Sequence, residues 1–360
     1  MGRASVAVFW EDDLNDWSNP AVLGYQRGIR YSYGKTRLVP SLAADVFFKS
    51  DRIAIGACGV GVSFAGKPFR ALGRLRLDYG VSEATNENGD VVGTFSSYEE
   101  IRQIGVGVSL IELLESVVNA TGGTRSNLSR YADLSLGHNW KHVVVDLAPA
   151  YITLDQRAGR GEADQRDRGA LLRVTPVGAM RGPVKLDLSG GFSQRNYDEV
   201  TISYIDVNQA DPIVEERLVG AAARLTCTLP HERGPIWDFL SPTVSAGATW
   251  EEAKYYWKGD RIGGRTGRTG EEITLLGLVS LRHGFVNDPT GEIVNDTWGY
   301  GVGLQYRGIA SVRYDWAQVP EAEAPDFRLP DVRRWGITVS FDPYRLIRSG
   351  RSEEGAVAAR

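Results

Sequence analysis

The chain has 360 residues, of which 42% are hydrophobic and 24% are charged, so it can bury a sizeable core and is not a disordered polymer. Its 41 basic residues nearly balance its 45 acidic residues, which excludes the strongly basic character of a nucleic-acid-binding protein. Glycine is in excess, because 42 glycines are about 12% of the chain against a usual value of about 7%. Together with many Trp and Tyr residues, this composition is typical of a β-barrel.

The cysteines and histidines give no sign of a metal or redox site. Two cysteines cannot make a disulfide framework, and we interpret Cys58 and Cys227 as small residues that are buried or face lipid. His138 and His142 would share one face of a helix, but the pattern around them is that of a strand. We therefore expect no metal and no other cofactor.

Residues 1–21 precede the first strand pattern and form a segment of their own. The segment is acidic, with the pair Asp12 and Asp13, and it ends in Asn19, Pro20 and Ala21. Proline fixes its own φ and asparagine favours a turn, so this tripeptide predicts a rigid turn just before the first strand.

From residue 22 onward the dominant signal is a period of two. In residues 298–307, for example, Trp298, Tyr300 and Val302 alternate with glycines. One face of each strand is large and apolar, whereas the other carries glycine, small hydroxyl residues and single charges. This alternation predicts an all-β fold, an antiparallel transmembrane β-barrel with Trp and Tyr girdles at the strand ends. A soluble β-sandwich, which also alternates, is the alternative.

About fourteen strands are predicted, an even number that suits a closed bacterial barrel. They span residues 22–33, 50–65, 69–81, 99–110, 128–138, 142–153, 167–179, 183–197, 214–228, 242–257, 271–285, 297–307, 309–317 and 333–341. Tight turns are expected at 66–68, 180–182 and 307–308, and long polar loops at 82–98, 154–166, 198–213, 258–270 and 318–332. Short and long connections fail to alternate between 229 and 297, so the strand count there stays open.

One segment departs from the period of two. Residues 109–119 place leucine, isoleucine and valine at helical spacing, with Glu112 and Glu115 on another side. We predict one short amphipathic helix inserted between strands. We expect it to pack at a barrel rim, and the alternative is a helix that binds a membrane surface or a partner.

Both ends of the chain resemble the FadL-like superfamily of outer-membrane barrels, and more closely its PorV/PorQ branch. At the amino end a Met-Gly-x-Ala run, an acidic pair and an Asn-Pro-Ala tripeptide match. The matching residues are Met1, Gly2, Ala4, Ser5, Val6, Ala7, Asp12, Asp13, Asn19, Pro20 and Ala21. At the carboxyl end, residues 313–320 and 333–343 are similar to the last two strands of that branch.

The resemblance implies an organisation and a location. It implies a hatch or lumen plug at 1–21, a barrel at 22–341 and a charged tail at 342–360. It also implies that an export signal precedes the family's Met-Gly motif, so we expect a bacterial outer-membrane protein whose signal peptide is absent from the sequence given. The expected surroundings are outer-membrane lipid and lipopolysaccharide.

Charges of both signs occupy positions that we expect to face the lumen. They are Arg74, Arg76, Asp78, Lys185, Asp187, Arg224, Glu251, Arg313 and Asp315. A strongly selective ion pore favours rings of a single sign, so we interpret the mixed charges as ion pairs that brace the wall.

Catalytic patterns are absent. Ser135, His138 and Asp133 share a strand, but alternation places His138 on the face opposite the other two. There is no G-x-S-x-G elbow and no phosphate-binding loop of the Gly-Lys-Ser/Thr type. We therefore do not expect an enzyme.

Two functions remain. The resemblance implies passage of a hydrophobic small molecule across the outer membrane, with the ligand controlled by a hatch that contains Asp12, Asp13 and Asn19 to Ala21. The alternative is a non-transporting partner or anchor barrel that binds proteins of a secretion or envelope complex. The charged long loops favour protein contacts, and nucleic acid is not an expected partner.

Overall fold

The computed structural model describes residues 4–10, 15–38, 45–65, 75–86, 88–122, 126–146, 160–179, 182–203, 210–231, 234–289, 293–319, 323–324, 327–328 and 332–345. The helical elements are η1 (Pro20–Tyr25), α1 (Leu110–Ala120), η2 (Leu128–Arg130) and η3 (Pro235–Asp238). The strands are β1 (Gly28–Arg37), β2 (Val46–Ala57), β3 (Val60–Ala65), β4 (Leu75–Thr85), β5 (Val91–Ser109), β6 (Ala132–Asp146), β7 (Arg160–Val177), β8 (Val184–Arg195), β9 (Thr201–Ser203), β10 (Ala210–Pro212), β11 (Glu215–Thr228), β12 (Thr243–Trp257), β13 (Asp260–Leu275), β14 (Val279–Asp288), β15 (Ile293–Tyr306), β16 (Ala310–Val319), β17 (Glu323–Ala324), β18 (Phe327–Arg328) and β19 (Val332–Phe341).

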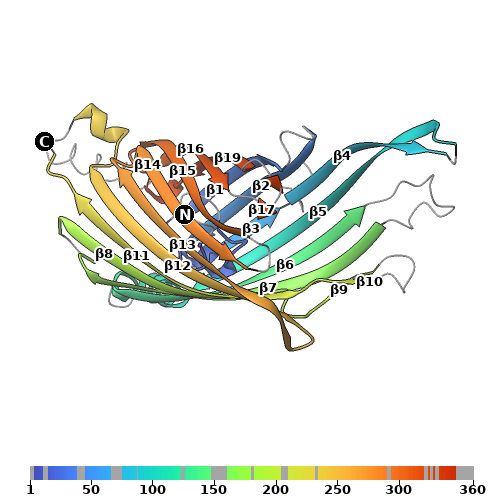
Figure 1. Cartoon of the computed structure of the whole chain (residues 1–360). Coiled ribbons are helices and arrows are strands. Elements are labelled where there is room, and N and C mark those ends of the chain that lie inside the picture. Colours follow the sequence, from blue (N-terminus) through green and yellow to red (C-terminus); the bar gives the residue numbers. More distant parts are fainter. Residues whose placement is uncertain are drawn as a thin grey trace, which may run out of the picture.

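Apart from β17 and β18, which pair with each other, the strands form one closed antiparallel barrel (Figure 1). Each strand pairs with its neighbours along the chain, and β19 pairs with both β16 and β1, so the sheet has no free side. Three wall strands are built from two labelled pieces each, namely β3 with β4, β8 with β9 and β10 with β11, which gives fourteen wall strands. The fold expected from the sequence is confirmed.

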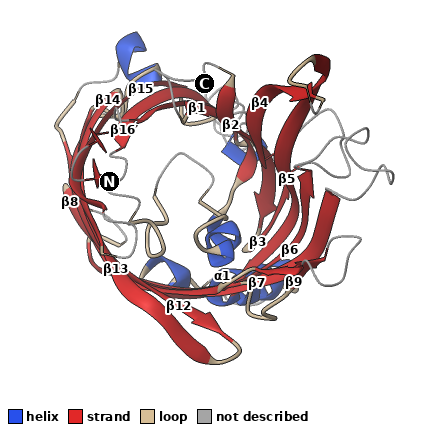
Figure 2. Cartoon of the chain, turned by 45° about the vertical axis from the view of Figure 1, so that its right-hand side comes forward, coloured by secondary structure: helices blue, strands red, loops and turns tan. Residues whose placement is uncertain are grey.

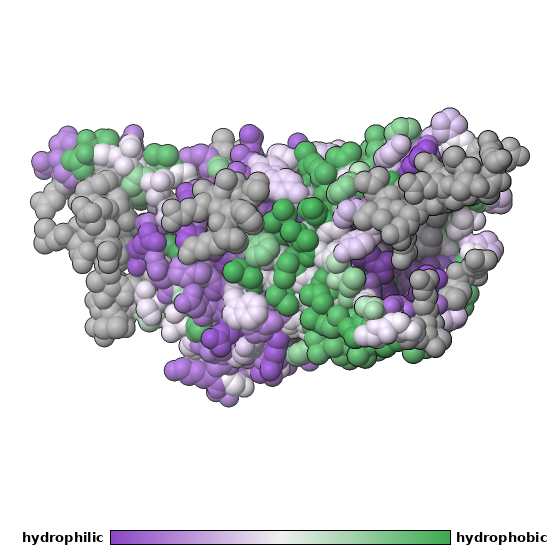
Figure 3. Space-filling view, turned by 180° about the vertical axis from the view of Figure 1, so that it is seen from behind, coloured by the Kyte–Doolittle hydropathy of each residue, from purple (hydrophilic) through white to green (hydrophobic). Residues whose placement is uncertain are grey.

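The two faces of the wall differ in chemistry. Apolar side chains such as Leu136, Trp298 and Leu304 are exposed on the exterior, while polar side chains such as Asp133, Ser193 and Thr249 are buried on the interior. Figure 3 shows apolar residues gathered in a band across the barrel, with polar residues beside it. A closed barrel leaves no backbone group unpaired at an edge, so this apolar face suits lipid and the protein is an outer-membrane barrel.

The two ends of the barrel also differ. At one end, here called the turn end, the wall strands are joined at 58–59, 178–183, 276–278 and 307–309, and through α1. The opposite end, the loop end, carries connections such as 147–159 and 320–331. Short turns of such barrels face the periplasm, so the turn end is the periplasmic end.

Glycine explains how close the start of the chain comes to the wall. Six glycines, one on each of six neighbouring strands, pair directly in register across the sheet. They are Gly28, Gly56, Gly61, Gly107, Gly137 and Gly169. A Cβ on Gly137 would lie 2.2 Å from the carbonyl carbon of Pro20, so a wall with side chains at this row could not accept the segment that crosses it.

Two of the predicted strands, 22–33 and 50–65, were wrong in their limits. Residues 22–33 start with the 3₁₀-helix η1, because Asn19 and Pro20 begin a helical turn, and β1 starts only at Gly28. Residues 50–65 are two strands joined by a turn at Cys58 and Gly59, which both have positive φ. Cys58 therefore lies exposed in a turn, whereas Cys227 lies half-buried in β11.

Two further errors cancel in the number of predicted strands, because one adds a strand and the other removes one. Residues 128–138 and 142–153 were predicted as two strands, but 132–146 are the single strand β6. Residues 258–270 were predicted as a loop, but they belong largely to β13, which a turn at 276–278 separates from β14. This turn restores the alternation of connections between 229 and 297.

The predicted helix at 109–119 is confirmed as α1, and Ser109 is its N-cap residue. In the part of the chain that the structure describes, no helix is both long enough and apolar enough to span a bilayer.

Candidate functional site: the lumen and its hatch

The start of the chain lies inside the ring of strands, as Figure 2 shows for its helical and loop segments. We call residues 4–10 and 15–26 the hatch. Residues Val6 to Val8 pack on Leu218 and on Ala222 and Ala253 of the inner wall. Leu23 is fully buried against Ala54 of β2. The chain's own N-terminal region thus lies in the lumen, packed on the inner wall.

Asp16 is the most deeply held polar residue of the hatch. Its side chain has no exposed surface, and it pairs with Arg52 on β2 at 2.9 Å. Ser63 on β3 and Gln103 on β5 donate hydrogen bonds to the other carboxylate oxygen at 2.6 and 2.8 Å. Asn139 on β6 donates to the backbone carbonyl of the same residue at 2.9 Å. One hatch residue therefore joins four wall strands.

A second buried ion pair lies beside the first. Lys141 of β6 pairs with Asp167 of β7, and neither side chain is exposed. The Lys141 ammonium also lies 3.6 Å from the centre of the Trp17 ring, a cation–π contact in a water-excluded position. Arg195 donates to the Trp17 carbonyl at 3.2 Å, so the residue after Asp16 is held as well.

The Asn19-Pro20-Ala21 turn is held by its asparagine. The Asn19 carbonyl oxygen of the side chain accepts from the Ala21 backbone at 3.0 Å, and Pro20 occupies the first position of η1. The Asn19 amide donates to the Val6 carbonyl at 2.8 Å and to the Ala170 carbonyl at 3.1 Å. The same side chain therefore caps a helix, closes the hatch on itself and fixes it to β7.

Tyr25 is the last residue of η1 and lies close to the end of the hatch. Its hydroxyl lies 3.1 Å from the Asp133 carbonyl and 3.0 Å from the Leu171 carbonyl. Burial raises the pKa of the Tyr25 phenol, and the nearby Asp133 carboxylate acts in the same direction. The phenol therefore stays protonated and keeps its proton to donate.

Glu251 holds the first hatch residues. One carboxylate oxygen accepts from the backbone N–H groups of Ser5 and Val6, both at 2.8 Å. The other oxygen pairs with Arg268 at 2.6 Å. Ser189 and Thr249 donate to backbone carbonyls of the same stretch, at 2.6 Å to Ala7 and 3.1 Å to Ala4.

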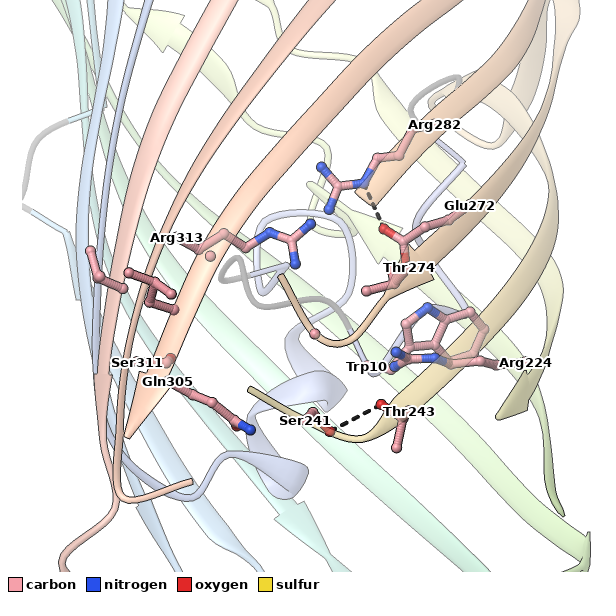
Figure 4. Close-up of a pocket in the computed structure, with 14 residues that line it drawn as sticks. Trp10, Arg224, Ser241, Thr243, Glu272, Thr274, Arg282, Gln305, Ser311 and Arg313 are labelled. Carbon is pink, nitrogen blue, oxygen red and sulfur yellow. Dashed lines mark hydrogen bonds and ion pairs between the residues drawn. The ribbon is translucent and has the colours of Figure 1, made fainter. Parts of the chain in front are cut away.

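A cavity of about 210 Å³ lies between the hatch and the wall formed by β11 to β16 (Figure 4). Trp10 borders it, and its ring lies 5.9 Å from the Arg224 guanidinium. Three arginines and one glutamate face the space, together with hydroxyl side chains. They are Arg224, Arg282, Arg313 and Glu272, with Ser241, Thr243, Thr274 and Ser311.

The charges at this cavity are arranged in a chain. Glu272 pairs with Arg282 at 2.6 Å, and Arg282 pairs with Asp315 at 2.5 Å. Arg313 pairs with the same oxygen of Asp315 at 3.0 Å. Opposite signs therefore alternate across β13, β14 and β16, which braces this side of the lumen.

Most predicted lumen charges face the lumen, but not all. Lys185 and Asp187 form an ion pair of 2.8 Å on the inner face of β8, and Arg224, Glu251, Arg313 and Asp315 are placed as described above. The prediction is wrong for Arg76 and Asp78. They form an ion pair with each other at 2.8 Å, and Arg76 is the cross-strand partner of Glu100 on β5. Glu100 and the lumen-facing Gln103 are three residues apart on β5, so they point to different faces of the sheet. Glu100, Arg76 and Asp78 therefore lie on the exterior face.

Three predicted residues, Asp12, Asp13 and Arg74, lie outside the described residues. The sequence analysis missed Arg52, Gln103, Lys141 and Asp167. Each is a polar residue at an inward position of its strand, and that position was the available signal.

The rejected catalytic set is divided by the wall. Asp133 and Ser135 are buried on the inner face of β6, whereas His138 is half-buried on the outer face. Within the described ranges, no group of three or more metal-binding side chains comes together.

A comparison with protein-family models finds no match, and neither does a comparison with curated proteins. Solved structures give distant similarities. A FadL homologue of Pseudomonas aeruginosa is 10% identical, with a TM-score of 0.43, covering 95% of this chain and 97% of that chain. A TodX mutant, a monoaromatic hydrocarbon channel, is 9% identical, with a TM-score of 0.46 over 91% and 93%. The Ralstonia pickettii toluene transporter TbuX is 8% identical, with a TM-score of 0.37 over 89% and 90%.

Proposed function

We propose that this protein is an outer-membrane channel for small hydrophobic molecules and that residues 4–10 and 15–26 are its hatch. The observation that carries the proposal is the way the lumen is closed. A wall of fourteen strands encloses a segment of the same chain. That segment is held by hydrogen bonds and ion pairs, chiefly at Asp16, Asn19 and Glu251, which can be exchanged for water.

The cavity beside Trp10 gives a ligand a place next to the hatch. Of the side chains that line it, the Trp10 ring is the apolar one, because those of Leu304 and Val312 are exposed on the exterior of the wall. A ligand there would contact the hatch directly, so its binding energy can favour a displaced hatch over the closed one.

The experiment compares the native protein with a variant whose hatch is loosened. We expect the native barrel to conduct ions poorly in a planar bilayer, because the hatch lies in the lumen. Asp16→Ala is expected to open larger and longer conductance events. Cells that produce the native protein are expected to take up radiolabelled toluene, a small uncharged aromatic, faster than cells without it.

A second function is favoured by one observation, the charged lining of the lumen. The chain of pairs from Glu272 through Arg282 to Asp315 braces the wall and suits a barrel that transports nothing. In that case the protein serves as a partner or anchor barrel of an envelope or secretion complex. A closed record from both native protein and Asp16→Ala, with no added uptake, would favour this second function.

A further inference from the structure

Helix α1 is amphipathic, but it exposes its apolar face and turns its polar face toward the protein, which is the reverse of an ordinary surface helix. Leu114 and Val117 are 64% and 52% exposed, and Leu110 and Val118 are exposed beside them. These four residues share one face of the helix, since they are spaced by three, four and seven or eight positions. None of the residues of α1 is buried.

The polar face of α1 is the one attached to the protein. Glu112 pairs with Arg27 at 3.1 Å, next to the start of β1. Glu115 accepts hydrogen bonds from the hydroxyl and the backbone N–H of Ser129 in η2, at 2.5 and 3.3 Å. These contacts fix how the helix is rotated about its axis, with the apolar face turned away from the barrel.

Hydrogen bonds to Ser109 and Ile111 also hold the start of the helix in place. The Asp133 carboxylate accepts from the Ile111 backbone at 3.1 Å and from the Ser109 hydroxyl. Ser109 also donates its backbone N–H to the Gly59 carbonyl in the turn between β2 and β3, at 2.7 Å. The helix therefore lies at the turn end and follows β5 directly in the chain, held by these contacts.

The exposed face of α1 continues the exterior of the barrel. Ser109 faces the lumen and Ile104 is exposed on the outer face of β5, so strand alternation places Leu110 on the exterior side. The helix packs against β6 and η2, where Leu136 of the outer wall and Leu128 of η2 are exposed. A single apolar surface thus runs from the lipid-facing wall of β6 onto the helix.

We infer that α1 is an interfacial helix, whose apolar face is buried in the lipid leaflet at the turn end of the barrel. Lipid is the occupant because this face continues the lipid-facing surface of the wall. Helices of this kind lie in the plane of the interface, with their apolar side among the acyl chains. The helix would fix the depth of the barrel and the position of the hatch end beside Arg27. This role does not depend on whether the barrel transports.

The test uses the full-length protein in phosphatidylcholine vesicles. Cys58 and Cys227 are replaced by serine, and single cysteines carry a nitroxide label: Leu114→Cys on the apolar face, Leu136→Cys on the outer wall and Asn119→Cys on the polar side of the same helix. Electron paramagnetic resonance then measures collisions with oxygen, which concentrates in lipid, and with a water-soluble nickel chelate.

We expect positions 114 and 136 to collide more with oxygen than with the nickel chelate, and position 119 to show the reverse. A label at 114 that behaves like the one at 119 would show that the face lies in water and would overturn the inference. A slow-moving label at 114 shielded from both reagents would show that protein covers it, which overturns the inference as well. Heat-modifiable mobility in electrophoresis verifies folding, and Val117→Cys is used if Leu114→Cys does not fold.

Discussion

At the scale of single residues, the closed state depends on a few buried polar groups that join the hatch to the wall. Asp16 is the clearest case, because its carboxylate joins Arg52, Ser63 and Gln103. A buried charge is expensive unless it is paired and hydrogen-bonded. These contacts therefore fix where the hatch lies. Only a hatch that places Asp16 at this point gives Arg52, Ser63 and Gln103 their partner.

Asp16→Ala is expected to release the hatch without unfolding the barrel. Removing one partner of a buried ion pair costs about 3 kcal/mol, which corresponds to roughly a hundredfold increase in the opening equilibrium. Hydrogen exchange of the peptide containing residues 15–26 should therefore accelerate by about this factor, while strand amides remain protected. The control Asp211→Ala removes an exposed carboxylate of β10 and should leave the exchange unchanged. Equal rates in the two variants would show that Asp16 does not hold the hatch.

The role of Asp16 could be read from the sequence only in part. The acidic N-terminal segment and the Asn19-Pro20-Ala21 turn are local signals, and they indicated a distinct segment before the barrel. The partners Arg52, Gln103 and Asn139 are separated from it by 36 to 123 residues, and alternation alone does not specify which inward residues meet the hatch. That knowledge requires the register of the sheet.

At the scale of elements, the period of two predicted most strands but not where some of them end. The turn at Cys58 and Gly59 lies inside an apolar run without an Asn-Gly or Asp-Gly signal, so the hairpin was read as one strand. In β6 the polar residues Asn139 and Lys141 interrupted the pattern, although they face inward and bind the hatch and Asp167. The strand was consequently divided in two.

The strand β13 was missed for a different reason. Its first half, from Asp260 to Gly267, is rich in glycine, arginine and threonine and has no apolar face. It lies near the loop end of the barrel, where strands extend beyond the lipid and the exterior no longer needs apolar residues. Periodicity detects a strand through burial of one face, so it fails where both faces meet water or polar groups.

Two neighbouring glycines of β8, Gly191 and Gly190, allow a prediction with a matched control in the same strand. A Cβ at Gly191 would lie 2.2 Å from the Val6 carbonyl oxygen, whereas the neighbouring Gly190 has open space. Gly191→Ala is therefore expected to displace the first hatch residues, at a cost of about 1–3 kcal/mol. Gly190→Ala should change stability by less than about 0.5 kcal/mol.

The measurement is hydrogen exchange at the Ser5 and Val6 amides, which donate to Glu251 in the native protein. These amides should exchange about tenfold or more faster in Gly191→Ala and at the native rate in Gly190→Ala, consistent with 1.4 kcal/mol for each factor of ten. If both alanines behave alike, the close contact between wall and hatch is not what fixes residues 4–10.

At the scale of the whole molecule, closure is a property of the last strand. Ile337 of β19 pairs on one side with Tyr33 of β1 and on the other with Tyr314 of β16. No other strand can take the place of β19, because the other edge of β1 is already paired with β2 and the other edge of β16 with β15. The alternating pattern of residues 333–341 predicted this strand, but that it joins the first strand follows from the ring and not from its own residues.

Ile337→Pro is therefore expected to prevent closure. Proline cannot donate a backbone hydrogen bond, and in the middle of a paired strand it costs about 3 kcal/mol or more. An unclosed barrel also leaves two strand edges exposed in lipid, where unpaired backbone groups are costly. Native protein should migrate differently in electrophoresis when boiled and unboiled, and Ile337→Pro should show only the unfolded mobility. Ile337→Val keeps the donor and the apolar exterior, so it should retain the folded band. A folded band of full intensity in Ile337→Pro would mean that β19 is dispensable for closing the barrel.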